Sequence, residues 1–353
     1  MKKVKEVYEA LEVCTDDGQR LNLLFSLATH LLNFDDKRSL EVAEQIRELS
    51  EQIGSHLGRS YYHSAKARVF YKRSLFYEAT DEFQKALDAA MLSSNLTQQA
   101  ICLDSLGIAF RFQKRYRESE DCSLKALQIL NSLEKSIGYT ATCYNNLGSL
   151  YQDQEEYDKA TECFNKGLAI AQQHHDERMA ANLLNNLSGI GILTHQYTEG
   201  LAYANQALSI FKSMNHKHGE VHATVLMGLC YLRLGNHATA MDCFLSGLKQ
   251  LKNVDHKLIE VQAYKGLGEV YAALLAYPEA NKNYSKAIAI GIKAHDYGEV
   301  CTILQLQAKM QLAANDLKAA KTTLTKARTI AAEQNLSKQL APLNELAATI
   351  GLP

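Results

Sequence analysis

The sequence predicts an all-α fold, a solenoid built from antiparallel helix pairs. The first observation behind this prediction is a small residue that recurs along the chain at a nearly constant interval. These anchor positions are Ala67, Gly107, Gly148, Ser188, Gly228, Gly268 and Ala308. A period of about 20 to 50 residues is the signature of a solenoid, in which each repeat buries its apolar face against its neighbours.

Small and large residues also stand at fixed distances after each anchor. The twelfth and nineteenth positions after it are small in every repeat, as at Ala160 and Gly167. The sixteenth position after each anchor carries Phe83, Ser123, Phe164, Ala204, Phe244, Tyr284 and Leu324. Alternating small and large residues let two helices approach closely while rings fill the gaps. Because glycine inside a helix costs about 1 kcal/mol relative to alanine, we interpret the anchor glycines as sites of close helix packing.

Three segments of one repeat carry a resemblance to a known family. They are Tyr144–Tyr151 (YNNLGSLY), Tyr157–Ala160 (YDKA) and Phe164–Leu168 (FNKGL). The repeat resembles the tetratricopeptide (TPR) family, in its long form of about 40 residues, and is similar to kinesin-light-chain-like repeats and to bacterial sensory TPR regions. The resemblance implies a right-handed superhelical solenoid whose first helices line a concave groove.

The repeat pattern divides the chain into four segments. Residues 1–18 are predicted to form an N-terminal capping helix with Val4, Val7, Tyr8 and Leu11 on one stripe, ending at Gly18. Residues 19–56 form a degenerate first repeat, and residues 57–336 form seven TPR repeats. Residues 337–353 are a C-terminal capping helix or the start of a further repeat.

Composition excludes several classes of protein. Lysine and arginine (38) nearly balance aspartate and glutamate (39), so no overall field favours nucleic acid or an anionic membrane. No apolar run is long enough to span a membrane, and the basic start lacks the apolar core of a signal peptide. We therefore expect a cytoplasmic protein without nucleic-acid partners.

Cysteine and histidine follow the repeat. Cysteines recur at equivalent positions, too far apart for disulfides, so we interpret them as buried packing residues. The helix dipole favours histidines near helix C-termini, where we expect His174, His175, His216, His256 and His295. The alternative is a metal or pH-sensing ridge, and His216, His218 and His222 form its tightest cluster.

Motifs of catalysis are missing from the sequence. It contains no phosphate-binding loop of the GxxxxGK[ST] type, no HExxH and no GxSxG. The acid pairs Asp35-Asp36 and Glu155-Glu156 fall at expected turns, where they cap the next helix. We therefore predict no enzyme activity, no catalytic residues, no metal and no cofactor.

The candidate binding residues lie on one face of the first helices, because their offsets from the anchors share a face at 3.6 residues per turn. The predicted peptide-binding set is Arg68, Lys72, Arg111, Asn145, Asn146, Asn182, Asn185, Asn186, Arg233, Lys265 and Lys309. Asp104, Asp153 and Glu269 share this face, so its balance is positive. We expect a preference for acidic or carboxylate-bearing segments, lost when Arg111 and Arg233 become glutamate.

The asparagines allow two interpretations. Asparagine is a poor helix former, and an amide offers both a donor and an acceptor. These side chains either bond to backbone and neighbouring repeats, or they read the backbone of a bound peptide, as similar asparagines do in some TPR relatives.

The function predicted from the sequence is a non-enzymatic scaffold that binds an extended protein segment in its groove, in bacterial signalling. The alternatives are the N-terminal sensory region of a histidine kinase or nucleotide cyclase, and a peptide-pheromone receptor. Apolar terminal helices also offer surfaces for a homodimer, and self-association stays open.

Overall fold

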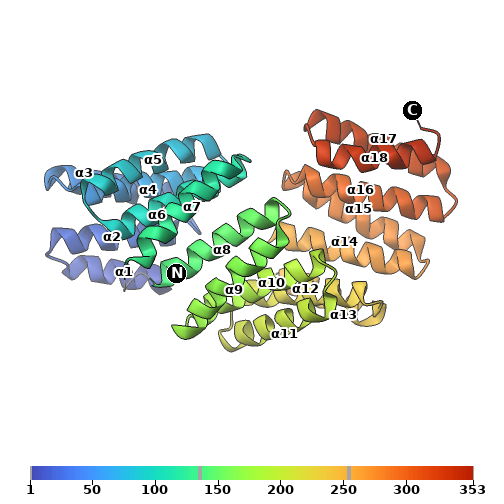
Figure 1. The fold of residues 1–353 in the computed structure, drawn as a ribbon, viewed down its shortest axis with the longest axis horizontal. Coiled ribbons are helices and arrows are strands. Elements are labelled where there is room, and N and C mark those ends of the chain that lie inside the picture. Colours follow the sequence, from blue (N-terminus) through green and yellow to red (C-terminus); the bar gives the residue numbers. More distant parts are fainter. Residues whose placement is uncertain (1, 134–136, 253–255, 353) are drawn as a thin grey trace. The chain divides into compact units, whose positions relative to one another are not determined.

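The computed structural model describes residues 2–133, 137–252 and 256–352. In these residues the chain forms eighteen helices, numbered α1 to α18, and no strand (Figure 1). The helices group into two compact units, residues 1–179 and 180–353, whose boundary falls in the first turn of α10. The prediction of an all-α fold of helix pairs is confirmed in both.

Each unit is a series of helices joined by short connectors. Unit 1 holds α1 (Lys2–Val13), α2 (Asp17–Leu31), α3 (Asp36–Gln52), α4 (His56–Lys72), α5 (Phe76–Leu92), α6 (Leu96–Phe112), α7 (Tyr116–Asn131), α8 (Ile137–Asp153) and α9 (Tyr157–Gln173). Unit 2 holds α10 (Glu177–Leu193), α11 (Tyr197–Ser213), α12 (Lys217–Arg233), α13 (His237–Leu251), α14 (Lys257–Ala273), α15 (Tyr277–Lys293), α16 (Tyr297–Ala313), α17 (Leu317–Glu333) and α18 (Ser337–Thr349). The even-numbered helices are the first helices of the pairs, and in unit 1 α2, α4, α6 and α8 pack against one another in turn.

The connectors explain the regular period. From α14 to α17 the helices all have the same length, and a connector of the same short length joins each to the next one. The middle residue of most connectors has a positive φ, as at Glu155 (64°) and Asn315 (59°). This left-handed residue lets the following N–H return to a carbonyl of the last helical turn, as Asp316 N–H does to Gln311 at 2.9 Å. Such a connector reverses the chain, so successive helices lie antiparallel.

One connector places an unsuitable residue in the left-handed position. Leu275 has φ of 60° and is 70% exposed, so it contacts little that would offset its backbone strain. Because asparagine tolerates this conformation, we expect Leu275→Asn to raise the free energy of unfolding by about 1 kcal/mol. Leu274→Asn is the control, since Leu274 has an ordinary φ of −84°. Equal effects of the two variants in urea denaturation would contradict this account.

Three anchor glycines, Gly148, Gly228 and Gly268, lie against the large residue at the sixteenth position after them, as the repeat pattern predicts. A methyl group added at Gly148 would be 2.6 Å from the Phe164 ring. In unit 2, a methyl group at Gly268 would be 2.5 Å from the Tyr284 ring. Phe164 and Tyr284 are among the largest fully buried side chains. The interpretation of the anchors as close-packing sites is therefore confirmed at these pairs.

The chain ends form helices, as the sequence indicates. Val4 and Leu11 of α1 are buried in the core of the first helices. Leu343 and Ala347 of α18 are buried against the last repeat. The predicted end of the first helix at Gly18 is wrong, because α1 ends at Val13 and Gly18 lies in the first turn of α2. Asp16 caps α2 there by accepting a hydrogen bond from the Gln19 N–H at 2.7 Å.

Histidine positions require a correction. His216 and His256 were predicted to lie at helix C-termini, but they occupy the N-cap positions of α12 and α14. The Nδ1 of His216 accepts a hydrogen bond from the Gly219 N–H at 3.1 Å. The predicted cap at Asp35 is confirmed, whereas Glu156 precedes α9 without a side-chain cap bond.

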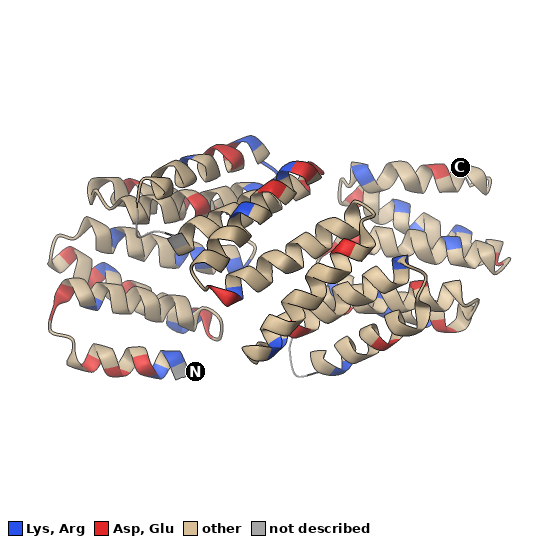
Figure 2. Cartoon of the chain, turned by 60° about the horizontal axis from the view of Figure 1, so that its bottom comes forward, with Lys and Arg blue, Asp and Glu red and all other residues tan. Residues whose placement is uncertain are grey.

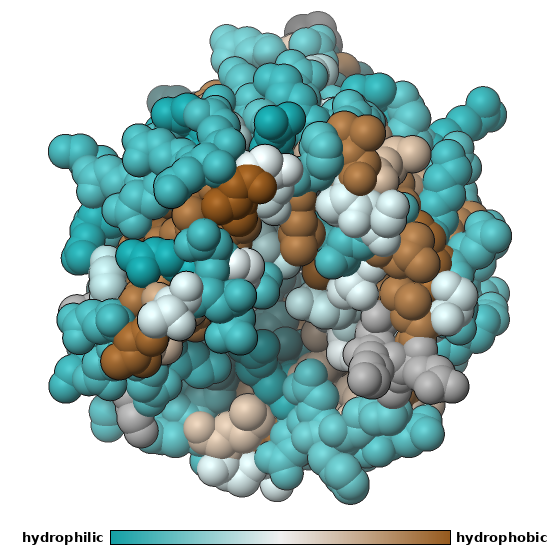
Figure 3. All heavy atoms as spheres, turned by 90° about the vertical axis from the view of Figure 1, so that its left-hand side faces the viewer, coloured by the Kyte–Doolittle hydropathy of each residue, from teal (hydrophilic) through white to brown (hydrophobic). Residues whose placement is uncertain are grey.

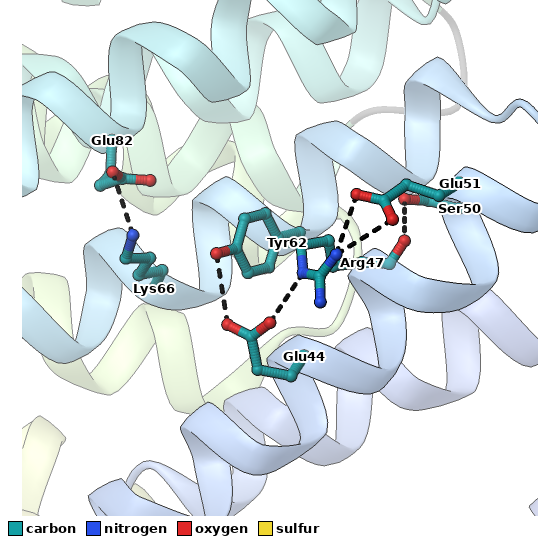
Figure 4. Close-up of polar contacts among 7 residues, drawn as sticks. All are labelled: Glu44, Arg47, Ser50, Glu51, Tyr62, Lys66 and Glu82. Carbon is teal, nitrogen blue, oxygen red and sulfur yellow. Dashed lines mark hydrogen bonds and ion pairs between the residues drawn. The ribbon is translucent and has the colours of Figure 1, made fainter.

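Polar contacts join the helices of unit 1 on their outer surfaces. Glu44 of α3 accepts hydrogen bonds from Arg47 and from the Tyr62 hydroxyl of α4 (Figure 4). Lys66 of α4 lies 3.3 Å from the carboxylate of Glu82 on α5. Figure 2 shows acidic and basic residues interspersed along the helices of each unit, consistent with the formal net charge of −1.

No helix in the described part of the chain is long and apolar enough to cross a membrane. All eight cysteines are free, and Cys102, Cys143, Cys163, Cys230 and Cys301 are buried.

Candidate functional site

The first helices of unit 1 do not pack completely together but leave an open cavity of about 650 Å³. Helices α2, α4, α6 and α8 supply most of its wall. Its lining includes Thr29, Leu32, Asn33, Arg68, Tyr71, Lys72, Ile101, Asp104, Ser105, Ile108, Tyr139, Thr142 and Asn146. Figure 3 views the molecule from the side of unit 1 and shows hydrophobic patches among hydrophilic residues. The lining of the cavity combines apolar and aromatic side chains with an equal number of polar and charged ones.

Arg68 is the cationic group of the cavity. It projects from the last turns of α4, and its guanidinium lies 5.4 Å from the centre of the Phe25 ring. Its Nε is fully buried and has no hydrogen-bond partner among the described residues. Burial lowers the pKa of Arg68, and the nearest opposing influences include the charge of Asp104. An arginine remains charged under such conditions, so the cavity holds a cation without an ion-pair partner.

Asp104 is the matching anionic group. Its Oδ2 accepts a hydrogen bond from the Asn146 amide at 2.8 Å. Its Oδ1 is buried and has no hydrogen-bond partner in the described residues. Burial raises the pKa of Asp104 to about 6, against the lowering influence of Cys143, Asn146, Arg68 and Arg111. The carboxylate is therefore ionised at neutral pH at a cost in free energy.

Lys72 is already occupied. Its Nζ lies 2.7 Å from Asp36 and 2.5 Å from the carbonyl of Leu32. These bonds tie the end of α4 to the connector that precedes α3. Lys72 thus shapes the rim of the cavity and offers a partly satisfied charge to a ligand.

Most other predicted basic residues form ion pairs between neighbouring first helices. Arg111 lies 3.5 Å from Asp153. In unit 2, Arg233 lies 2.6 Å from Glu269, and Lys265 lies 2.6 Å from Glu299. Lys309 is exposed on α16. Acidic partners within the chain thus compensate most of the positive charge of this face. Some of these partners, such as Glu299, are not among the residues predicted for the face.

The asparagines differ in their surroundings. Asn146 binds Asp104, and the Asn145 amide lies 3.4 Å from the Asn146 oxygen. In unit 2, the buried Asn185 amide lies 3.4 Å from Nδ1 of His222. Asn182 is exposed and Asn186 is partly buried on the same helix. Internal bonding therefore accounts for Asn146 and for the amide nitrogen of Asn185, whose Oδ1 is buried without a partner among the described residues, while Asn182 is exposed.

In the described residues, the histidine cluster of unit 2 does not bring three possible metal ligands together. Burial, with the charge of His256, lowers the pKa of His222 to about 4, so its ring is neutral at pH 7. His216 caps a helix. Within the described ranges, no three His, Cys, Asp or Glu side chains lie together as metal ligands would.

Sequence analysis located part of the cavity wall and missed the rest. Arg68, Lys72 and Asn146 belong to the predicted set, and Asp104 was placed on the correct face. Thr29 and Asn33 were missed because they lie in the degenerate first repeat, where the phase is weak. Tyr139 lies further before its anchor than any residue of the predicted set, whereas Thr142 stands at the same offset as Asn182 and was left out of the set. Extending the offsets towards the helix start would have found Tyr139.

Comparisons with known proteins agree with this fold. Residues 99–173 match the family model described as tetratricopeptide repeat. None of the curated proteins compared with the sequence matches it.

Several solved structures have the same fold over nearly the whole chain. Aspartyl phosphate phosphatase F from Bacillus subtilis superposes with a TM-score of 0.68 at 14% identity, covering 93% of each chain. The quorum sensor NprR from B. thuringiensis gives a TM-score of 0.68 at 13% identity, covering 92% of this chain and 91% of its own. The Rap conjugation gene regulator of plasmid pLS20, in complex with the Phr* peptide, gives 0.66 at 17% identity, covering 96% and 92%. At such identities the likeness concerns the fold alone. Residues 99–173 therefore match the tetratricopeptide repeat, and the helix-pair fold continues on both sides of this segment.

Proposed function

We propose that this chain is a regulator that binds an extended peptide along its first helices and acts by binding rather than by catalysis. The observation that carries the proposal is the cavity of about 650 Å³ between the first helices of unit 1. Ligand sites in proteins commonly measure about 300 to 1,000 Å³ and combine apolar walls with a few polar groups. A packed solenoid without a ligand would gain stability by closing this space.

The solved structures favour one form of the proposal, the peptide-pheromone receptor. One neighbour is a quorum sensor, and another is in complex with a peptide. A third is a phosphatase, so the fold is compatible with proteins of more than one kind. Support for the receptor is the shared fold together with a cavity in which Nε of Arg68 and Oδ1 of Asp104 have no hydrogen-bond partner among the described residues.

The ion pairs of Arg111 and Arg233 complicate the test of an acidic ligand. Arg111 and Arg233 are paired with acids, so their replacement by glutamate would break contacts within the chain as well as change the field. The acidic preference of the ligand stays a prediction, as do a cytoplasmic location, the absence of nucleic-acid partners and a homodimer through α1 and α18.

A cavity-filling variant tests peptide binding. Ser105 lines the cavity, so Ser105→Trp is expected to reduce retention of peptides from a random decapeptide pool to less than about a tenth of wild type. Retained peptides are identified by mass spectrometry. Ser246→Trp places the same side chain on the exposed surface of α13 and should retain peptides like wild type. Equal retention by both variants, or no retained peptide with wild type, would overturn the proposal.

A further inference from the structure

Two opposite charges border the cavity of unit 1 without pairing with each other. Arg68 comes from α4, and Asp104 comes from the neighbouring first helix α6. Neither an ion pair nor a hydrogen bond joins them, although each influences the ionisation of the other. An uncompensated charge in a partly buried site is costly, and protein structures normally pair it.

Other groups near the cavity do not supply the missing partners. Lys72 is bound to Asp36, and Arg111 lies beside Asp153. Asn146 donates to Oδ2 of Asp104, and a hydrogen bond from the Cys143 thiol also favours the ionised carboxylate, but Oδ1 has no partner within hydrogen-bond distance among the described residues. The guanidinium of Arg68 contacts the Phe25 ring, which attracts a cation but offers no hydrogen-bond acceptor. What remains is the Nε–H donor of Arg68 and the Oδ1 acceptor of Asp104, and both residues line the cavity.

We propose that this cavity binds a free α-amino acid with a large apolar side chain, as a small effector. Its α-carboxylate pairs with the guanidinium of Arg68, and its α-ammonium pairs with Oδ1 of Asp104. Both atoms are buried in the structure, so binding requires a rotation of the Arg68 and Asp104 side chains towards the ligand. The apolar side chain of the ligand lies against Ile101, Ile108 and Tyr71, which line the same space.

The charges distinguish a free amino acid from a peptide end. A peptide C-terminus brings a carboxylate without an ammonium, and a peptide N-terminus brings the reverse. Only a zwitterion compensates both charges of the cavity at once. The volume of about 650 Å³ exceeds what one small amino acid fills, so large side chains are favoured. This inference uses the same cavity as the proposed function but does not depend on peptide binding.

Four small probes test the inference directly. L-leucine and L-phenylalanine are titrated into the full chain at pH 7.5 by isothermal calorimetry, beside N-acetyl-leucine and leucinamide. We expect the free amino acids to bind at least about tenfold more tightly than either blocked form, because each blocked form leaves one charge unpaired. Equal binding of N-acetyl-leucine would assign the cavity to a peptide C-terminus, and equal binding of leucinamide to an N-terminus. Either result, or no binding of the free amino acids, overturns the inference.

Two variants identify the residues. Arg68→Gln and Asp104→Asn are each expected to weaken leucine or phenylalanine binding by about 10 to 100-fold. Arg59→Gln, an exposed arginine on the same helix as Arg68, and Asp121→Asn, an exposed aspartate on α7, should bind like wild type. Asp104→Asn keeps the shape of the side chain, and circular dichroism checks that Arg68→Gln remains folded. Unchanged affinity in either folded variant would contradict the assigned contacts.

A pH series provides an independent readout. Asp104 takes up a proton near pH 6 and then loses its charge for the ammonium group. Affinity should therefore fall by roughly tenfold from pH 7 to pH 5, and this fall should be absent in Asp104→Asn. The same fall in both proteins would contradict the role of Asp104. The two experiments can fail separately. If the protein retains no peptide but binds free amino acids, the proposed function fails and this inference stands.

Discussion

Gly266→Ala is expected to lower the free energy of unfolding by about 2 kcal/mol or more, although alanine is the better helix former. A methyl group at Gly266 would lie 2.3 Å from the Phe244 ring. Phe244 is completely buried and also contacts Gly228, where a methyl group would lie 2.7 Å away. The ring is thus held between glycines of α12 and α14 and has no space into which to move. Urea denaturation followed by circular dichroism measures the change.

Gly189→Ala is the matched control. Gly189 also lies inside a helix of unit 2, but a methyl group there would meet nothing within 4 Å. This variant is expected to gain about 0.5 to 1 kcal/mol from helix propensity. Adding Phe244→Leu to Gly266→Ala should cost less than the sum of the two single changes, because the smaller side chain makes room for the methyl group. Additive effects, or a stabilising Gly266→Ala, would show that the ring does not set this packing.

Asp104→Asn is expected to stabilise the protein at neutral pH by about 1 to 3 kcal/mol. Because the folded state raises the pKa of Asp104 from 3.8 to about 6, it binds a proton more readily than the unfolded chain between these values. The contribution of Asp104 to the free energy of unfolding is therefore most favourable below about pH 4 and becomes less favourable as the pH rises through about 6. Asparagine carries no such charge and still accepts the bond from Asn146. Because Asp104 is partly exposed, we expect the gain in free energy of unfolding to lie below the upper end of this range.

The measurement compares variant and wild type across pH. The difference in free energy of unfolding should be near zero at pH 4, grow through pH 5 and 6, and level off above pH 7. Asp121→Asn, at an exposed position on α7, should show no such profile. A flat difference for Asp104→Asn would mean that its carboxyl group is not destabilised by burial. A gain in stability at the expense of ligand binding is typical of residues kept for function.

Periodicity was sufficient to predict the helix pairs because each repeat solves the same packing problem. The spacing between Gly268 and Tyr284 is visible in the sequence, and the structure brings the two together. Chain reversal was less visible, because residues as different as Leu275 and Asn315 occupy the left-handed connector position. Their conformation follows from the helices that they join rather than from their own preferences.

The site was predicted only as a helix face. The offsets placed Arg68, Asp104 and Asn146 on that face, since helical geometry alone decides it. Whether a charged residue finds a partner depends on the distance between side chains of neighbouring repeats. Arg233 and Glu269 form such a pair, and the spacing of residues along the chain does not give this distance. The sequence pattern placed His216 at the C-terminus of α11, whereas it is the N-cap of α12. The connector between these helices is so short that His216 lies close to the end of one and directly before the other.

The constant helix length with equally short connectors has a consequence for the history of the gene. Between α14 and α17, the helices begin at a fixed interval, at Lys257, Tyr277, Tyr297 and Leu317. Duplication or loss of any segment there that comprises two helices and their connectors restores the same succession of first and second helices and the same joints. Recombination between similar repeats could thus lengthen or shorten such a protein without a new folding solution, and selection would then act on the few side chains that differ from one copy to the next.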